Sequence, residues 1–443
     1  MATISLKQLT ESVRQQRFSA SDLTRSCARS LANASRAIGD CFVWTDADAA
    51  QTAAELIDQQ LADGAGLPLA GVVFSAKELI GVSGMPDSAA SYLSELPGHP
   101  MGEAPLVSQL KAQGAVVIGK TKATEFGLAQ HALERRLPAN PHDPLRVTGG
   151  SSSGSAAAIA HGVGAFSIGT DTGGSVRAPA AFCGVAGYLP TAESWPHDGM
   201  LPLAPVADRI GVLAPSVANI RFLYTAVSSV SDSLPVLGKV RLGIPTGALL
   251  ADLDSEVEQA FLAAVSCLQK AGVQFTELLL PDLSVVERFF NNNLPAGLTE
   301  RLGAELLSNS SQQLDPVTRA RLEPWYKGTT VPELVSVEEL AEFRQSVLTV
   351  IAGADVHGWI LPTVPGLAPL RSSLGNVAAI LEWQGRASRN TRPVNLLNLP
   401  AVNLPLPAGD HVFCGLQVVG ADSNDSRLLA LAAALELALK AMP

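Results

Sequence analysis

Short apolar segments rich in β-branched residues alternate with helical segments along this chain, and this alternation restricts the fold more than any other feature. Amphipathic patterns predict helices at 19–34, 46–64 and 252–272. Apolar runs predict buried strands; the clearest lie within 67–84, 162–174, 238–245, 357–365 and 411–420. Strands that alternate with helices indicate an α/β fold, in which a mixed or parallel sheet is covered by helices on both faces.

Composition excludes several classes of function. Of the 443 residues, 47% are hydrophobic and 16% are charged, so the chain can bury a large core. The net charge is -10 and no basic cluster occurs, which argues against nucleic acid and against an anionic membrane surface as partners. The first ten residues lack the basic and apolar regions of a leader peptide. The apolar stretch 428–442 is too short to span a bilayer and carries Glu436 and Lys440.

The cysteines favour a reduced, cytoplasmic protein. They are odd in number and widely spaced, and no Cys-x-x-Cys pair occurs among Cys27, Cys41, Cys183, Cys267 and Cys414. We therefore expect buried thiols, with neither a disulfide framework nor a metal site, and we expect no cofactor.

One motif fits a nucleotide-binding loop by its letters alone. Residues 114–121 read GAVVIGKT and satisfy G-x-x-x-x-G-K-[ST]. A phosphate-binding loop needs open backbone N–H groups, whereas residues 115–118 are Ala-Val-Val-Ile, which is a strand sequence. The segment therefore predicts a strand with Lys120 near its end, and a P-loop protein stays a distant alternative.

A second motif fits the nucleophile elbow of α/β-hydrolases. Residues 150–154 read GSSSG, with Ser152 in the position of the nucleophile. An elbow follows a buried strand, but the preceding residues are polar and broken by prolines. His357 and His411 are available as bases, and nothing around them singles them out.

A third set of residues could carry nucleophilic catalysis. Lys77 ends an apolar strand, a serine-rich loop spans 149–155, and Ser175 follows a glycine-rich turn. Backbone N–H groups in such a turn can stabilise an oxyanion. A nucleophilic serine needs a base, and a lysine can act as one if burial lowers its pKa. Considered alone, Lys77 would be interpreted as a surface or ion-paired lysine. Ser175 alone would be interpreted as a helix cap.

Together these pieces resemble the amidase signature family. The block at 149–191, GGSSSGSAAAIAHGVGAFSIGTDTGGSVRAPAAFCGVAGYLPT, is similar to the hallmark of that family. The resemblance extends to 70–86, 103–127, 360–369, 391–407 and 413–420, and it weakens between about 225 and 350. It implies a single large mixed β-sheet covered by helices on both faces.

The resemblance also implies roles for individual residues. Lys77 matches the catalytic lysine, Ser175 the nucleophile, and Ser151 the bridging serine that follows a cis peptide bond in relatives. The oxyanion hole would consist of backbone N–H groups of Thr172, Gly173, Gly174 and Ser175. Ser152 and Ser153 are possible supporting residues, and Asp171 and Arg177 would hold the loop. Ser175 would then attack an amide carbonyl while its proton passes through Ser151 to neutral Lys77.

The implied organisation is one amidase domain over 1–443. Its parts would be N-terminal helices at 1–65, a signature core at about 66–225, a variable substrate-side region at about 226–350, and the rest of the core at 351–443. Aromatic residues that could line an acyl pocket are Phe289, Phe290, Trp325, Tyr326 and Trp383.

The function implied is hydrolysis of a small-molecule carboxylic amide to an acid and ammonia or an amine. Two alternatives within the family stay open at this point: hydrolysis of a urea-like C–N bond, as in biuret- or allophanate-type relatives, and glutamine hydrolysis as a subunit of a transamidation complex. Many relatives are homodimers, which makes a homodimer one expectation for this chain.

Overall fold

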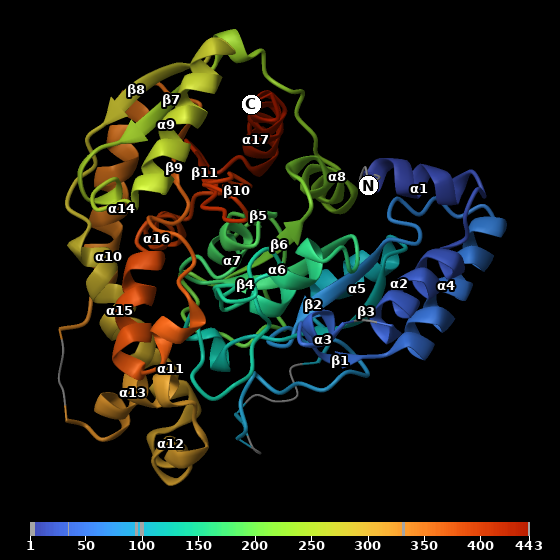
Figure 1. The fold of residues 1–443 in the computed structure, drawn as a ribbon, viewed down its shortest axis with the longest axis horizontal. Coiled ribbons are helices and arrows are strands. Elements are labelled where there is room, and N and C mark those ends of the chain that lie inside the picture. Colours follow the sequence, from blue (N-terminus) through green and yellow to red (C-terminus); the bar gives the residue numbers. More distant parts are fainter. Residues whose placement is uncertain (1–4, 34, 94–95, 98–101, 330–332, 442–443) are drawn as a thin grey trace.

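The computed structural model describes residues 5–33, 35–93, 96–97, 102–329 and 333–441. The first four residues, on which the leader interpretation partly depends, lie outside this range. The described residues form one eleven-stranded sheet that runs through the molecule (Figure 1). In spatial order the strands are β1 (Phe42–Thr45), β3 (Val116–Thr121), β2 (Val73–Lys77), β4 (Phe166–Asp171), β6 (Arg209–Ala214), β5 (Ala186–Leu189), β10 (Ala401–Leu404), β11 (Leu416–Gly420), β9 (Gly358–Pro362), β7 (Arg241–Pro245) and β8 (Gln274–Leu278).

The sheet is mixed, as the resemblance implied. Strand β2 is parallel to β3 and β4, and β7 is parallel to β8 and β9. The strands between these two groups pair antiparallel. Segments predicted as strands from their apolar, β-branched runs form β2, β4, β7, β9 and β11, most of them fully buried.

Helices cover both faces of the sheet. On β6, Val212 packs in one core cluster with Ile220 of α8 (Val217–Ser228). The adjacent Leu213 packs in another, with Ile159 of α6 (Ser153–Ala160) and Ala180 of α7 (Arg177–Phe182). Because successive residues of a strand point to opposite faces, α6 and α7 lie on one face and α8 on the other, where α17 (Asp425–Leu439) packs against α8.

The N-terminal helices lie at the β1–β3 end of the sheet (Figure 1). They are α1 (Leu6–Arg14), α2 (Ala20–Ala32), α3 (Arg36–Gly39) and α4 (Ala47–Ala62), and α5 (Pro105–Ala112) precedes β3. Ser19 caps α2 by accepting from the N–H of Asp22, whose side chain accepts from the N–H of Ser19 in return. This reciprocal pair fixes where the helix begins.

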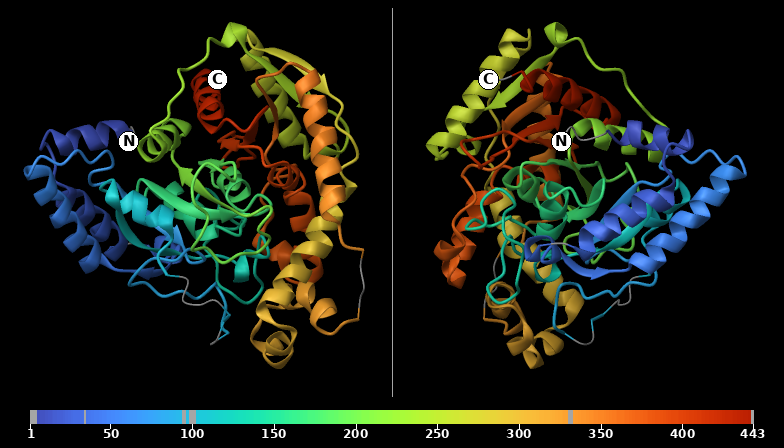
Figure 2. Two further views of the ribbon diagram at one scale, coloured as in Figure 1. Left: turned by 180° about the vertical axis from the view of Figure 1, so that it is seen from behind. Right: turned by 45° about the vertical axis from the view of Figure 1, so that its right-hand side comes forward.

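The region of weak resemblance is mainly helical. It contains α9 (Ser255–Lys270), α10 (Ser284–Arg288), a π-helical turn (Phe289–Asn293), α11 (Leu294–Leu302), α12 (Ala304–Asn309), α13 (Pro316–Tyr326) and α14 (Val337–Gly353). Together with α15 (Val377–Ala387) and α16 (Arg392–Leu397), these helices lie at the end of the molecule opposite α1–α4 (Figure 2).

The nucleotide-binding alternative does not fit the structure. Residues 116–121 form strand β3, so their N–H groups lie within the sheet ladder. Lys120 is fully buried and pairs with Asp87, and its Nζ also donates to the carbonyl of Pro86 at 2.9 Å.

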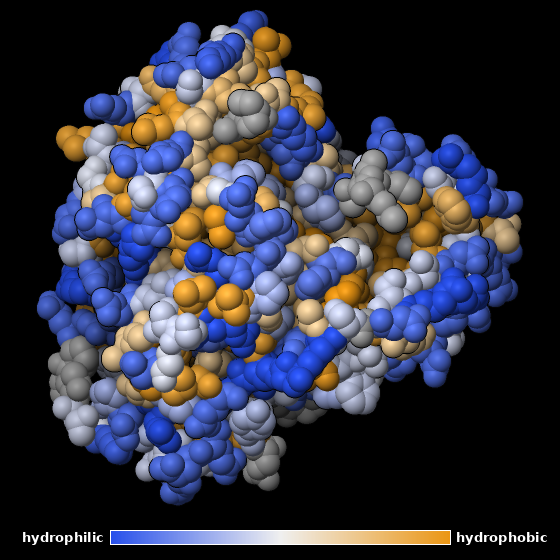
Figure 3. Space-filling model, viewed as in Figure 1, coloured by the Kyte–Doolittle hydropathy of each residue, from blue (hydrophilic) through white to orange (hydrophobic). Residues whose placement is uncertain are grey.

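Hydrophilic residues dominate the face shown in Figure 3. Across the described ranges, no helix combines the length and the apolarity that crossing a membrane requires.

Candidate active site

Lys77 lies at the carboxyl end of β2 and is fully buried. Its Nζ lies 2.6 Å from Ser151 Oγ and 2.7 Å from Thr170 Oγ1. Burial lowers the pKa of Lys77 from 10.5 to about 7, against the opposing effect of nearby carboxylates, of which Asp171 is the strongest. The amine is therefore uncharged in a large share of molecules at neutral pH and can accept a proton.

Ser151 is the residue of the serine-rich loop that contacts Lys77. The peptide bond between Gly150 and Ser151 is cis, as the resemblance implied. The Ser151 side chain is fully buried, and its carbonyl accepts from the N–H of Thr124 at 3.2 Å. Ser151 is thus held from both sides, with its hydroxyl directed at the lysine.

Ser175 is half-buried and lines a pocket. Its carbonyl accepts from the N–H of Ser152 at 3.2 Å, which joins the loop of Ser175 to the loop of Ser151. The structure thus brings the three predicted segments together and hydrogen-bonds Lys77 to Ser151. No hydrogen bond joins the hydroxyls of Ser151 and Ser175 within the described residues, and such contacts often tighten only when substrate binds.

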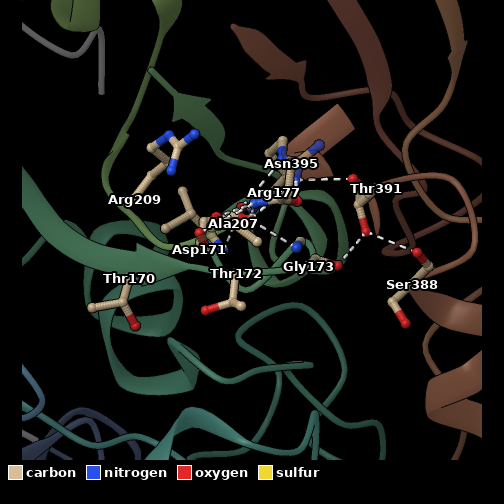
Figure 4. Close-up of polar contacts among 12 residues, drawn as sticks. Thr170, Asp171, Thr172, Gly173, Arg177, Ala207, Arg209, Ser388, Thr391 and Asn395 are labelled. Atoms are coloured by element: carbon tan, nitrogen blue, oxygen red, sulfur yellow. Dashed lines mark hydrogen bonds and ion pairs between the residues drawn. The ribbon is translucent and has the colours of Figure 1, made fainter. Parts of the chain in front are cut away.

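The loop that carries Ser175 is shaped by a buried ion pair between Asp171 and Arg177. Both side chains are fully buried, with Nη2 of Arg177 3.0 Å from Oδ1 of Asp171. Burial alone would raise the pKa of Asp171, but the Arg177 guanidinium and several hydrogen bonds lower it to about 2. Figure 4 shows these contacts, together with Asn395, whose Nδ2 donates to Asp171 Oδ1 at 2.9 Å. The supporting role expected for Asp171 and Arg177 therefore has a structural basis.

One of the expected oxyanion donors is already engaged. The N–H of Gly174 donates to Asp171 Oδ1 at 2.7 Å, so it points into the loop. Within the described part of the chain, the N–H groups of Gly173 and Ser175 donate to no other residue. Gly174 has φ +116°, and a Cβ there would lie 2.1 Å from Thr391 Oγ1, so only glycine fits.

Thr172 is anchored on the other side of the turn. Its Oγ1 donates to Asp208 Oδ1 at 2.6 Å. The second carboxylate oxygen of Asp208 accepts from the N–H groups of Leu203 and Ala204, so one carboxylate connects the turn to the segment that contributes Leu203 to the pocket.

The nucleophile-elbow interpretation of Ser152 is wrong. Ser152 is fully buried, and no strand precedes it among residues 141–150. Its Oγ donates to the carbonyl of Thr170 at 3.4 Å, and Ser153 Oγ donates to the carbonyl of Gly149 at 2.6 Å, so both hydroxyls hold the loop. His357 and His411 are exposed and do not line the pocket.

The pocket at Ser175 contains about 370 Å³ of space between atoms, part of which is open to solvent. One side comes from residues 127–130, Thr172, Gly173 and Ser175, and the rest from Leu203, Phe290, Leu294, Arg321, Gln384, Ser388 and Arg392. Of the five aromatic residues suggested from the sequence, only Phe290 lines this pocket. Gln130, Arg321, Gln384 and Arg392 were not predicted as pocket residues, because they lie in separate helices and loops; of the four, only Arg392 falls within a segment of the resemblance, 391–407.

A sequence model described as Amidase matches residues 22–429 of the chain. The chain belongs to the amidase family. Membership places it among the hydrolases that act on amide C–N bonds.

Individual relatives agree over most of the chain. It is 32% identical to a 2-amino-5-chloromuconic acid deaminase from Comamonas testosteroni, over 98% of this chain and 96% of the relative. It is 31% identical to an indoleacetamide hydrolase from Pseudomonas savastanoi, over 84% of this chain and 85% of that one. A solved amidase structure superposes with a TM-score of 0.83 at 29% identity, covering 98% of this chain and 99% of the other. This amidase therefore shares its whole fold with known members of the family.

Proposed function

We propose that this amidase hydrolyses a primary carboxylic amide to an acid and ammonia through an acyl-enzyme on Ser175. The observation that carries the proposal is the 2.6 Å contact between Lys77 and Ser151 beside the pocket that Ser175 lines. A buried lysine with a pKa near 7 is a competent base at neutral pH. The names of the two relatives, a deaminase and an amide hydrolase, agree with release of ammonia.

In the proposed reaction, Ser175 Oγ bonds to the carbonyl carbon as its proton passes to Ser151, while the proton of Ser151 passes to neutral Lys77. The resulting oxyanion accepts hydrogen bonds from the N–H groups of Gly173 and Ser175, each contributing about 3 kcal/mol. The C–N bond then breaks, Ser151 returns a proton to the departing nitrogen, and Lys77 restores the proton of Ser151. Water attacks the acyl-enzyme along the same path, releasing the acid.

The test is ammonia release from a panel of primary amides by the purified chain. We expect Ser175→Ala to lower kcat by at least about 10⁴-fold with an unchanged circular dichroism spectrum. Ser228→Ala, on α8 away from the pocket, serves as the matched control and should keep wild-type activity. Turnover by Ser175→Ala at the wild-type rate would refute the assignment.

The same panel separates the alternatives. Biuret in the panel tests the urea-like reaction. L-Glutamine tests the role of a glutamine-hydrolysing subunit. The purified chain is assayed alone, and its rate on glutamine is compared with its rate on simple amides. The homodimer and the cytoplasmic location remain predictions based on the resemblance and on the cysteine pattern; light scattering on the purified protein tests the first.

A further inference from the structure

Two arginines line the pocket of Ser175. Arg321 comes from α13 and Arg392 is the first residue of α16, so segments far apart in the chain bring two cations to one small site. Arg321 donates to the carbonyls of Leu128 at 2.5 Å and Phe290 at 2.8 Å. The Arg392 guanidinium lies 5.1 Å from the centre of the Phe290 ring. These contacts fix both side chains and leave several of their N–H donors unused.

The two arginines differ from several other cations of this protein, which form ion pairs. Arg177 pairs with Asp171, Arg135 with Glu78, and Lys120 with Asp87. In the described part of the chain, neither Arg321 nor Arg392 has a carboxylate oxygen within ion-pair distance. The pocket therefore holds two positive charges with no paired carboxylate.

The electrostatics of the pair support this description. Burial, and then the neighbouring charge of Arg392, lower the pKa of Arg321 to about 9. Burial lowers the pKa of Arg392 to about 10, and Glu287 opposes that shift without forming an ion pair. Both guanidinium groups stay charged at neutral pH, and an unpaired charge that is partly withdrawn from water is costly. An anion in the pocket would stabilise both.

We propose that the amide hydrolysed by this enzyme carries a carboxylate besides the amide group, and that Arg321 and Arg392 bind this carboxylate. The inference rests on the proposed function, since it names the substrate class of the same site. A guanidinium matches a carboxylate with two parallel hydrogen bonds, which is why arginine is the common partner for such groups. The pocket is small and partly open to solvent, which favours a short acyl chain.

A neutral group in the pocket fits the other end of such a substrate. Gln130 lines the pocket and is buried, and its Oε1 has no hydrogen-bond partner in the described structure. This oxygen can accept from an N–H of a primary amide. The pocket thus offers an acceptor for the amide nitrogen and cations for an acid group, which describes a half-amide of a short dicarboxylic acid.

The experiment compares matched substrates. The sodium salts of the monoamides of succinic, glutaric and adipic acid are assayed against butyramide, valeramide and hexanamide, which have the same carbon counts. We expect kcat/KM for the best half-amide to exceed that of its neutral counterpart by at least about 30-fold. Arg321→Met and Arg392→Met should each remove most of this preference, mainly through KM.

Two further variants control for misfolding and for general effects. Arg319→Met alters another arginine of α13, which does not line the pocket, and should leave the preference intact. If Arg321→Met proves unstable, Arg321→Lys replaces it in the test. Arg321→Lys keeps the charge and should retain part of the preference. Equal loss on charged and neutral amides in both methionine variants, or a wild-type preference for the neutral amides, would overturn the inference.

Binding to Ser175→Ala separates this inference from the proposed function. Calorimetric titration with the half-amides should show binding that Arg321→Met weakens at least about tenfold. If the wild type hydrolyses neutral amides and the half-amides do not bind, the carboxylate inference fails and amide hydrolysis stands. If half-amides bind in an arginine-dependent way but no amide is turned over, the proposed reaction fails and the carboxylate site stands.

Discussion

Replacing Lys77 by methionine should change how stability depends on pH. The folded protein holds this proton only below about pH 7, whereas the unfolded chain holds it up to about pH 10.5. The unfolded state therefore binds more protons between these values, so the wild type gains stability as pH rises through this window. The gap of about 3.5 corresponds to about 5 kcal/mol over the full range, at about 1.4 kcal/mol per pH unit.

The part that can be measured is smaller. From pH 7 to pH 9, the free energy of unfolding of the wild type should rise by about 2 kcal/mol relative to Lys77→Met. The methionine variant also leaves the hydroxyls of Ser151 and Thr170 without the amine, which costs about 1–3 kcal/mol for each group. This cost does not depend on pH over the range, so it cancels in the comparison.

Urea unfolding at pH 7, 8 and 9 provides the assay. Lys239→Met, which replaces an exposed lysine, is the control. Its free energy of unfolding should differ from that of the wild type by the same amount at each pH. In parallel, log kcat/KM of the wild type should rise with pH up to about 7 and then level off, because the uncharged amine is the base. If the free energies of unfolding of the wild type and of Lys77→Met differ by the same amount from pH 7 to pH 9, Lys77 is not a buried lysine with a lowered pKa.

Three other substitutions test the loop and the pocket. Gly174→Ala places a Cβ against Thr391, so we expect about 1–3 kcal/mol of destabilisation and at least about a tenfold loss of kcat; thermal unfolding and ammonia release measure the two effects. Asp171→Asn leaves the Arg177 guanidinium buried without its carboxylate, and urea unfolding should show a loss of about 3–5 kcal/mol. Phe290→Ala enlarges the pocket, so the ratio of kcat/KM between a bulky and a small acyl amide should rise; an unchanged ratio would place Phe290 outside the acyl site.

The sequence predicted the parts of the site that depend on local chemistry. A buried apolar strand ending in Lys77 and two glycine-rich turns with serines can be recognised from the residues themselves, and the structure brings these segments together. The engagement of the Gly174 N–H could not be predicted, because it depends on where the Asp171 side chain folds back.

The walls of the pocket could not be predicted for a different reason. Arg319 and Arg321 lie two residues apart on α13, and only Arg321 lines the pocket. Which of them faces inward is decided by how α13 packs against α11 and α15, and neither spacing nor composition carries that information. Phe290 was expected from the sequence together with four other aromatic residues, and the sequence could not single it out, because it lies in a π-helical turn whose register differs from that of an ordinary helix.

The bonds of Arg177 have a consequence for protein synthesis. Besides Asp171, this guanidinium binds the side chains of Asn395 and Gln417, which lie 218 and 240 residues further along the chain. A nascent polypeptide that has already exposed Ser175 to solvent still lacks both of these partners. The ribosome must therefore release nearly the entire chain before the loop can take its final shape, so unfinished translation products should be unable to hydrolyse cellular amides.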